Sequence, residues 1–158
     1  MEKKQRTLNN KGFSLIELIV VIAIMAILVG ALAPQYMKFV ERSRKSTDVQ
    51  NVAAIKSALE VYAADPMVEP ANALKTGKVT IKTTEAAVSD SNATGNGNVA
   101  LAAAGISSLV LKSSKWPASG GDITSYALDY TVSSNGTVNF TEKTALTSGY
   151  SILNGKYN

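Results

Sequence analysis

Segment 11–17, KGFSLIE, places one carboxylate, Glu17, at the start of a long apolar run. A charged side chain inside a membrane costs about 2.5 to 3.5 kcal/mol on insertion scales, so Glu17 needs a partner there. A cut between Gly12 and Phe13 would create an amine with an ordinary pKa of about 8. This amine would lie one helical turn from Glu17 and would supply the opposite charge. The segment therefore predicts an ion pair that depends on cleavage.

Pairing between neighbouring subunits would give Glu17 a role in assembly. If helices pack in parallel, each Glu17 can meet the amine of a neighbour and so set the axial stagger between two subunits. An unpaired charge in a low dielectric costs several kcal/mol, which makes such a pair good at specifying register. The alternative is that Glu17 lies near the cytoplasmic interface, where its carboxylate reaches water.

The apolar run that holds Glu17 covers residues 13–33 and is followed by Pro34. As a helix it rises about 31 Å, and a hydrocarbon core is about 30 Å thick, so we predict a membrane-spanning helix. A secretory signal peptide is one alternative, because residues 31–33 (ALA) resemble its cleavage site. However, the run is longer than the apolar core of a signal peptide, and cleavage would leave Pro34 first. A buried helix of a soluble domain is less consistent with this length.

Charge does not decide the orientation of this helix, because basic residues flank it on both sides. Those before it are Lys3, Lys4, Arg6 and Lys11, and those soon after it are Lys38, Arg42, Arg44 and Lys45. The formal net charge is +4, of which +3 belongs to the first twelve residues. The remainder is nearly neutral, so no nucleic-acid binding is predicted.

The helical pattern continues beyond the apolar run. Val52, Ile55 and Leu59 recur at three and four residues and form one apolar face. Since a residue before proline disfavours the helical region, Asp65-Pro66 predicts a stop, and the helix spans residues 13–64. Within it, Gly30 and Pro34 predict a hinge with a kink or local melting, because proline removes one backbone hydrogen bond. The alternative is that Gly30 and Pro34 have no hinge function, because membrane helices often tolerate both residues.

Residues 65–158 form the predicted head, whose signals are weaker. They comprise a strand at 79–83, a loop at 90–98, a short helix at 99–111 interrupted by Gly105, a hairpin of 123–132 with 137–141, and a last strand near 150–153. The hairpin turn contains Asn135-Gly136, two residues that tolerate positive φ. Tyr126, Leu128 and Tyr130 would share the face that covers the helix.

This N-terminus resembles that of type IV pilins and of the pseudopilins of type II secretion. The resemblance rests on the basic leader, segment 11–17 and the apolar helix with Gly30 and Pro34, and it covers about a third of the chain. It implies that residues 1–12 are a leader that a membrane peptidase removes after Gly12 on the cytoplasmic side. It further implies methylation of Phe13, an assembly carboxylate at Glu17, and unwinding near Gly30 and Pro34 in a filament. The implied fold is α+β, a long helix against a small antiparallel sheet.

Several other sites and functions are disfavoured by composition. The chain has neither Cys nor His, so it lacks the usual zinc ligands and the usual general base, and the C-terminal disulfide frequent in the pilin family is absent. Residues 90–95 resemble half of a calcium loop, but Leu101 stands where a bidentate Glu is needed. Asn-x-Ser/Thr triplets occur at Asn92, Asn135 and Asn139 and are frequent by chance in such a chain. No catalytic, cofactor or metal site is predicted, and no enzyme.

The predicted function is that of a structural subunit. After cleavage and methylation the chain would polymerise with copies of itself into a helical filament, a type IV pilus serving adhesion, motility or DNA uptake. Its partners would be the prepilin peptidase, the pilus assembly machinery and, before assembly, the cytoplasmic membrane, which it would cross once before becoming extracellular. Two alternatives stay open: a pseudopilin of a type II secretion or competence system, and a membrane-anchored binding protein that never polymerises.

Overall fold

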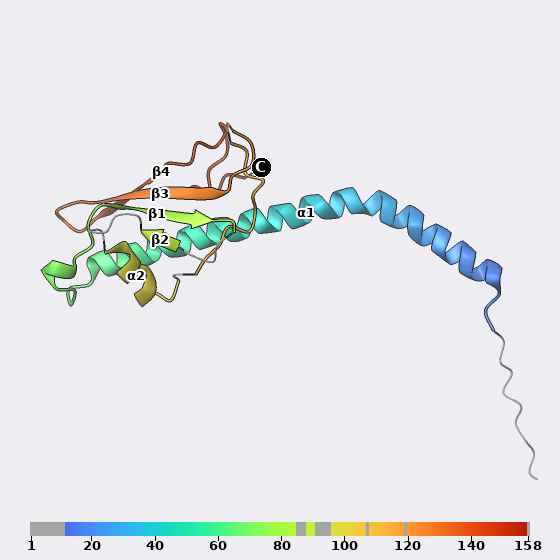
Figure 1. Ribbon diagram of the computed structural model, residues 1–158, viewed down its shortest axis with the longest axis horizontal. Helices are drawn as coiled ribbons and strands as arrows, with labels where there is room; N and C mark the ends of the chain where they lie inside the picture. Colours follow the sequence, from blue (N-terminus) through green and yellow to red (C-terminus); the bar gives the residue numbers. More distant parts are fainter. Residues whose placement is uncertain (1–11, 85–87, 91–95, 107, 119, 158) are drawn as a thin grey trace, which may run out of the picture. The chain divides into compact units, whose positions relative to one another are not determined.

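The computed structural model describes residues 12–84, 88–90, 96–106, 108–118 and 120–157. The chain divides into two compact units, Met1–Phe39 and Val40–Asn158. One helix, α1 (Leu15–Ala64), begins in the first unit and ends in the second (Figure 1). It matches the predicted helix except that it begins two residues later.

The first unit exposes an apolar helical surface. Among the described residues, α1 is the one helix long and apolar enough to cross a membrane, and its most apolar 18-residue window has a mean hydropathy of 3.0 with no residue buried. Large apolar side chains stay exposed from Phe13 to Phe39. Such a surface is stable in lipid or against other helices.

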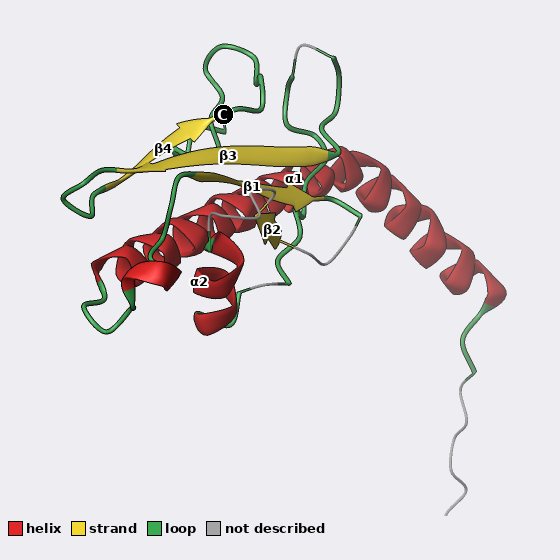
Figure 2. Ribbon diagram, turned by 60° about the vertical axis from the view of Figure 1, so that its left-hand side comes forward, coloured by secondary structure: helices red, strands yellow, loops and turns green. Residues whose placement is uncertain are grey.

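The second unit, the head, holds an antiparallel sheet whose strands lie in the order β2-β1-β3-β4. The strands are β1 (Gly77–Lys82), β2 (Val88–Asp90), β3 (Ser125–Val132) and β4 (Val138–Glu142). Figure 2 shows β1 and β3 lying along the part of α1 that belongs to the head. The predicted α+β class is confirmed, and so are the strand near 79–83 and the hairpin, within two residues at each end. The three-residue edge strand β2 was not predicted.

The core of the head lies between this sheet and α1. The predicted helix face is confirmed, since Val52, Ile55 and Leu59 are buried at 1% exposure or less. On β3, Tyr126, Leu128 and Tyr130 alternate with less buried residues and belong to the same core cluster. They are therefore the inner face of the sheet, as predicted. Trp116 and Ile152 complete the core from the loops and the C-terminal region.

The turn of the β3–β4 hairpin differs from the prediction in one respect. Gly136 has φ +81°, but Asn135 does not have positive φ. Instead the side-chain Oδ1 of Asn135 accepts the N–H of Thr137 at 3.1 Å. The turn therefore needs the left-handed region at a single residue, Gly136, and Asn135 contributes a hydrogen bond.

Gly136→Ala is expected to lower the free energy of unfolding of the head by about 1 kcal/mol, because a Cβ is strained at positive φ. Added bulk is not the cause, since that Cβ would meet only the carbonyl oxygen of Ala63, at 3.7 Å. Chemical denaturation of the full chain in detergent measures the change. Gly120→Ala is the matched control, because Gly120 has neither positive φ nor a neighbour within 4 Å. Equal stability of both variants would contradict the assignment.

Two predicted elements are corrected. The helix expected at 99–111 is α2, Gly97–Ala103, and it ends in a Schellman motif at Gly105, φ +70°. There the N–H of Gly105 donates to the carbonyl of Ala102, and the N–H of Ile106 donates to that of Leu101.

No strand forms at 150–153. Ser151 and Lys156 instead exchange two backbone hydrogen bonds, of 2.9 and 2.8 Å, that close a turn. The expected loop at 90–98 is shorter, because Asp90 ends β2 and residues 97–98 begin α2. Most of the calcium-like segment, with Asn92, lies outside the described residues.

Candidate functional site

Glu17 lies in the first turn of α1, where it completes a capping box. Its Oε2 accepts the backbone N–H of Ser14 at 2.7 Å, and the hydroxyl of Ser14 accepts the N–H of Ile16 at 3.2 Å. Both bonds satisfy backbone donors that the start of a helix leaves unpaired. The carboxylate also lies at the positive end of the helix dipole. In the uncleaved chain, Glu17 therefore already has a hydrogen-bond donor.

This cap explains why the helix begins at Leu15 and not at Phe13. Ser14 is the N-cap, so Gly12 and Phe13 precede the helix. Phe13 is 93% exposed, and a Cβ added to Gly12 would meet no atom within 4 Å. The Ser-x-x-Glu spacing is the sequence signal for this cap, and we did not predict it. The two residues of the predicted cleavage site are thus sterically accessible next to Glu17.

Gly30 and Pro34 both lie inside α1, and the helical assignment continues through them without interruption. Pro34 has no N–H to donate to the carbonyl of Gly30, so the helix lacks one hydrogen bond at this point. The predicted local melting is not present in this structure. The hinge stays a prediction for the assembled state.

A second polar site, which we did not predict, fixes the head to α1. Asp48 is fully buried. Its Oδ1 accepts the N–H of Lys112 at 2.6 Å, and its Oδ2 accepts the N–H of Ser113 at 3.1 Å and the indole N–H of Trp116 at 2.9 Å. Burial raises the pKa of Asp48 above its ordinary value, although these three hydrogen bonds act in the opposite direction. Asp48 is thus a structural acceptor in the head.

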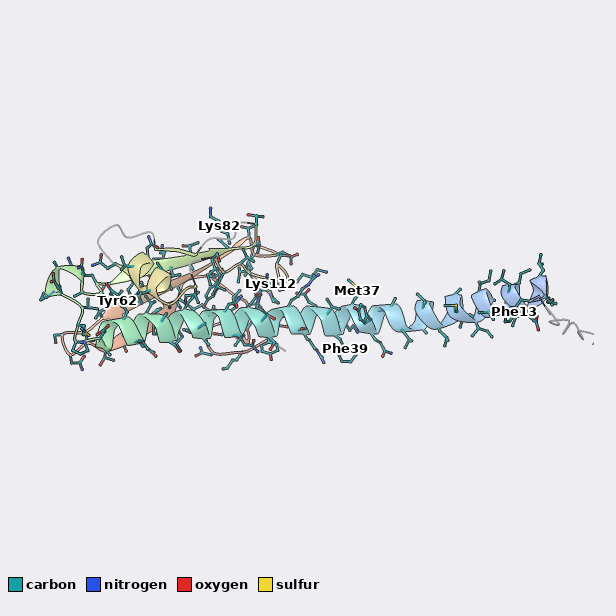
Figure 3. The ribbon with its side chains drawn as sticks, turned by 90° about the horizontal axis from the view of Figure 1, so that it is seen from below. Phe13, Met37, Phe39, Tyr62, Lys82 and Lys112 are labelled. Carbon is teal, nitrogen blue, oxygen red and sulfur yellow. The ribbon has the colours of Figure 1, made fainter. Side chains whose placement is uncertain are left out.

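A further contact holds the same loop. The hydroxyl of Ser113 donates to the carboxylate of Glu41, about two helical turns before Asp48, and its Oγ accepts the N–H of Lys115 at 3.1 Å. Residues 112–116, which we call the anchored loop, are therefore held against α1 by two carboxylates. Figure 3 shows Lys112 beside the helix.

The C-terminal region is closed by noncovalent contacts. The ammonium of Lys45 lies 5.5 Å from the ring centroids of both Trp116 and Tyr150. Tyr157 packs edge-on against Trp116, with 6.3 Å between centroids. The carboxylate of Glu142 accepts the N–H of Ile152 at 3.0 Å. These contacts fix the C-terminal region without a disulfide, since the chain has no cysteine.

Within the described residues, no group of three or more His, Cys, Asp or Glu side chains is placed to hold a metal ion. One hollow of the head, of about 480 Å³, is lined mainly by small apolar side chains, together with Tyr62 and Asp65. The features that carry chemistry thus gather at the start of α1.

Comparison with known proteins agrees with this placement. Residues 7–33 match the family described as the prokaryotic N-terminal methylation motif. The start of the chain is therefore of the class that carries this motif.

Similar proteins indicate a more specific class of protein than the methylation motif alone. The chain is 44% identical over 50 residues to a fimbrial protein of Pseudomonas aeruginosa, an alignment covering 32% of each chain. It is 43% identical over 58 residues to prepilin peptidase-dependent protein A of Clostridium perfringens, covering 36% of this chain and 41% of the relative. It is 39% identical over 54 residues to the type IV major pilin protein of Myxococcus xanthus, covering 34% and 24%. These matches confirm the resemblance to the type IV pilin family over the N-terminal third of the chain.

The alignments with these relatives cover between about a quarter and two fifths of each relative's length. No solved structure matches the chain significantly.

Proposed function

We propose that this protein is a prepilin whose mature form polymerises into a type IV pilus. The observation that carries the proposal is the coincidence, at one helix start, of an N-terminal methylation motif, an exposed apolar surface of membrane-spanning length and a first-turn carboxylate, Glu17. The role is that of a structural subunit, as the names of the relatives suggest.

Processing would take place at the accessible bond between Gly12 and Phe13. A peptidase must reach an extended backbone, and both residues precede the helix. The name of the Clostridium perfringens relative, prepilin peptidase-dependent protein A, supports the same class of enzyme for this chain. Methylation would then fall on the new amine of Phe13.

Assembly would use the apolar surface of α1 and the charge of Glu17. A carboxylate has room for several hydrogen bonds, so Glu17 can retain the N–H of Ser14 and still receive the Phe13 amine of a neighbouring subunit. Packing against other helices supplies van der Waals contacts that lipid alone does not. The filament would thus be a homo-oligomer that assembly machinery draws from the cytoplasmic membrane to the cell exterior.

Intact mass and N-terminal analysis of protein sheared from the cell surface test this proposal. We expect filaments whose subunits begin at methylated Phe13. Gly12→Val is expected to leave the full-length precursor in the membrane fraction, because the added side chain lies next to the cleaved bond. Since a Cβ at Gly12 meets nothing in this structure, that loss would reflect processing and not folding.

The remaining candidates give different results in the same assay. A pseudopilin would be processed but absent from long surface filaments. An anchored binding protein would keep residues 1–12 in cells with an active peptidase, and that result would overturn the proposal.

A further inference from the structure

Four basic residues belong to the two segments that meet where the anchored loop contacts α1, with Arg42 and Arg44 on opposite flanks of the helix. Arg42 and Arg44 are exposed on the helix, and Lys112 and Lys115 are exposed on the loop. The loop residues are distant in sequence from the helix residues, and the hydrogen bonds of Ser113 to Glu41 and to Asp48 bring them beside it. We call Arg42, Arg44, Lys112 and Lys115 the basic surface.

Little negative charge opposes these cations. Asp48 is buried and accepts three N–H donors. Glu41 accepts the hydroxyl of Ser113 and lies 3.9 Å from Arg44, whose side chain is 54% exposed. Among the described residues, Arg42, Lys112 and Lys115 make no ion pair. These two carboxylates are thus occupied within the protein. Asp122 is exposed beside the anchored loop, because the N–H of Ile123 donates to the carbonyl of Ser114, and the four cations outnumber it.

The basic surface also follows the apolar run closely in sequence. Tyr36 and Phe39 come directly after the run and are 66% and 64% exposed. Arg42 follows Ala33 by nine residues, a helical rise of at most about 14 Å. Aromatic residues followed by cations are typical of segments at a membrane–water interface, where long basic side chains reach the headgroups.

We propose that the basic surface binds the anionic headgroups of phospholipids in the leaflet on the head side. This binding would occur while the subunit is anchored in the membrane, before assembly. The inference rests on the membrane-anchored stage of the proposed function. Phosphate groups are acceptors that Arg and Lys bind by charge-assisted hydrogen bonds. Each basic residue near an anionic surface adds attraction that falls off within a Debye length. The head would therefore be held against the bilayer until assembly removes it.

Amine accessibility in nanodiscs tests this binding. The full chain is reconstituted in discs of phosphatidylcholine alone or of phosphatidylcholine with phosphatidylglycerol, and acylation of each lysine is measured by mass spectrometry. We expect the anionic lipid to lower the labelling of Lys112 and Lys115 several-fold relative to Lys75, which is exposed just before β1, and high salt to restore it.

Paired variants assign the effect to the basic surface. Arg42→Gln with Arg44→Gln keeps both reporter lysines and is expected to reduce their protection. Lys56→Gln with Lys78→Gln removes the same charge elsewhere on the head and is expected to leave the protection in place.

The outcomes separate this inference from the proposed function. A chain that does not insert into discs contradicts the membrane stage of the proposed function. An inserted chain with equal labelling in both lipids overturns the lipid site alone. Protection that is equal in phosphatidylcholine and grows with the number of chains per disc would assign the surface to contacts between copies and likewise overturn it.

Discussion

Glu17→Ala is expected to abolish surface filaments while the protein remains in the membrane and is still processed. In the proposed filament the substitution removes the carboxylate that would receive the Phe13 amine of a neighbour, so an incoming subunit would lose its register and leave a buried amine unpaired. Electron microscopy of cells and quantification of sheared protein measure the loss, and mass analysis of the membrane fraction measures processing. Normal filaments in this variant would contradict the assembly role.

The capping box requires a control for this prediction, because Glu17→Ala also removes a bond to the N–H of Ser14. Ser14→Ala removes the other half of the box and leaves the carboxylate in place. A lost cap costs about 1 kcal/mol and affects only the first turn. We therefore expect Ser14→Ala to keep its filaments. Loss of filaments in both variants would assign Glu17 to helix capping alone.

Asp48→Ala is expected to lower the free energy of unfolding of the head by about 3 kcal/mol, because two buried N–H donors and one part-buried N–H donor lose their acceptor. The corresponding fall in melting temperature is about 10 °C. Thermal unfolding of the full chain in detergent measures it through the fluorescence of Trp116, which is the single Trp of the chain and one of the three donors.

Two further variants define the cause. Asp48→Asn retains one amide oxygen as acceptor, so its loss of stability should be smaller than that of alanine. Asp122→Ala removes an exposed carboxylate and should change stability by no more than about 0.5 kcal/mol. If Asp48→Ala unfolds at the wild-type temperature, water takes the place of the carboxylate as the acceptor, and the stability of the anchored loop does not depend on Asp48.

Periodic and local patterns made much of the fold predictable. The apolar run and the spacing of Val52, Ile55 and Leu59 placed α1, since both patterns are confined to one helix. The alternation of Tyr126, Leu128 and Tyr130 placed the inner face of β3. The hairpin followed from the turn residues between two alternating runs.

Features that depend on distant residues were not predictable in the same way. The neighbours of Asp48 in the sequence include Ser, Thr and Lys, a pattern that predicts a solvent-exposed helix position. Its hydrogen-bond partners lie 64 to 68 residues away and could not be predicted from this local pattern. The edge strand β2 has three residues and no pattern of its own. The strand expected at 150–153 was wrong, because burial of Ile152 is achieved in a closed turn.

At the start of α1, a functional role for Glu17 was predicted, but its hydrogen bond to Ser14 was not. Glu17 stands out as a charge in an apolar run, and this drew attention to cleavage and assembly. The cap with Ser14 follows from a spacing of three residues that soluble and membrane helices share. Cleavage at Gly12, methylation of Phe13 and the hinge at Gly30 and Pro34 stay predictions, since each concerns a state beyond the isolated chain.

The closure of the C-terminal region determines what the head requires in order to fold. Lys45 beside two aromatic rings and Glu142 at the N–H of Ile152 make noncovalent contacts, which form without any chemical reaction. A head closed by a disulfide would instead require an oxidant, and an enzyme that transfers the electrons of its thiols to that oxidant. This head needs neither, so its maturation is independent of the redox state of its surroundings and can proceed equally well without oxygen.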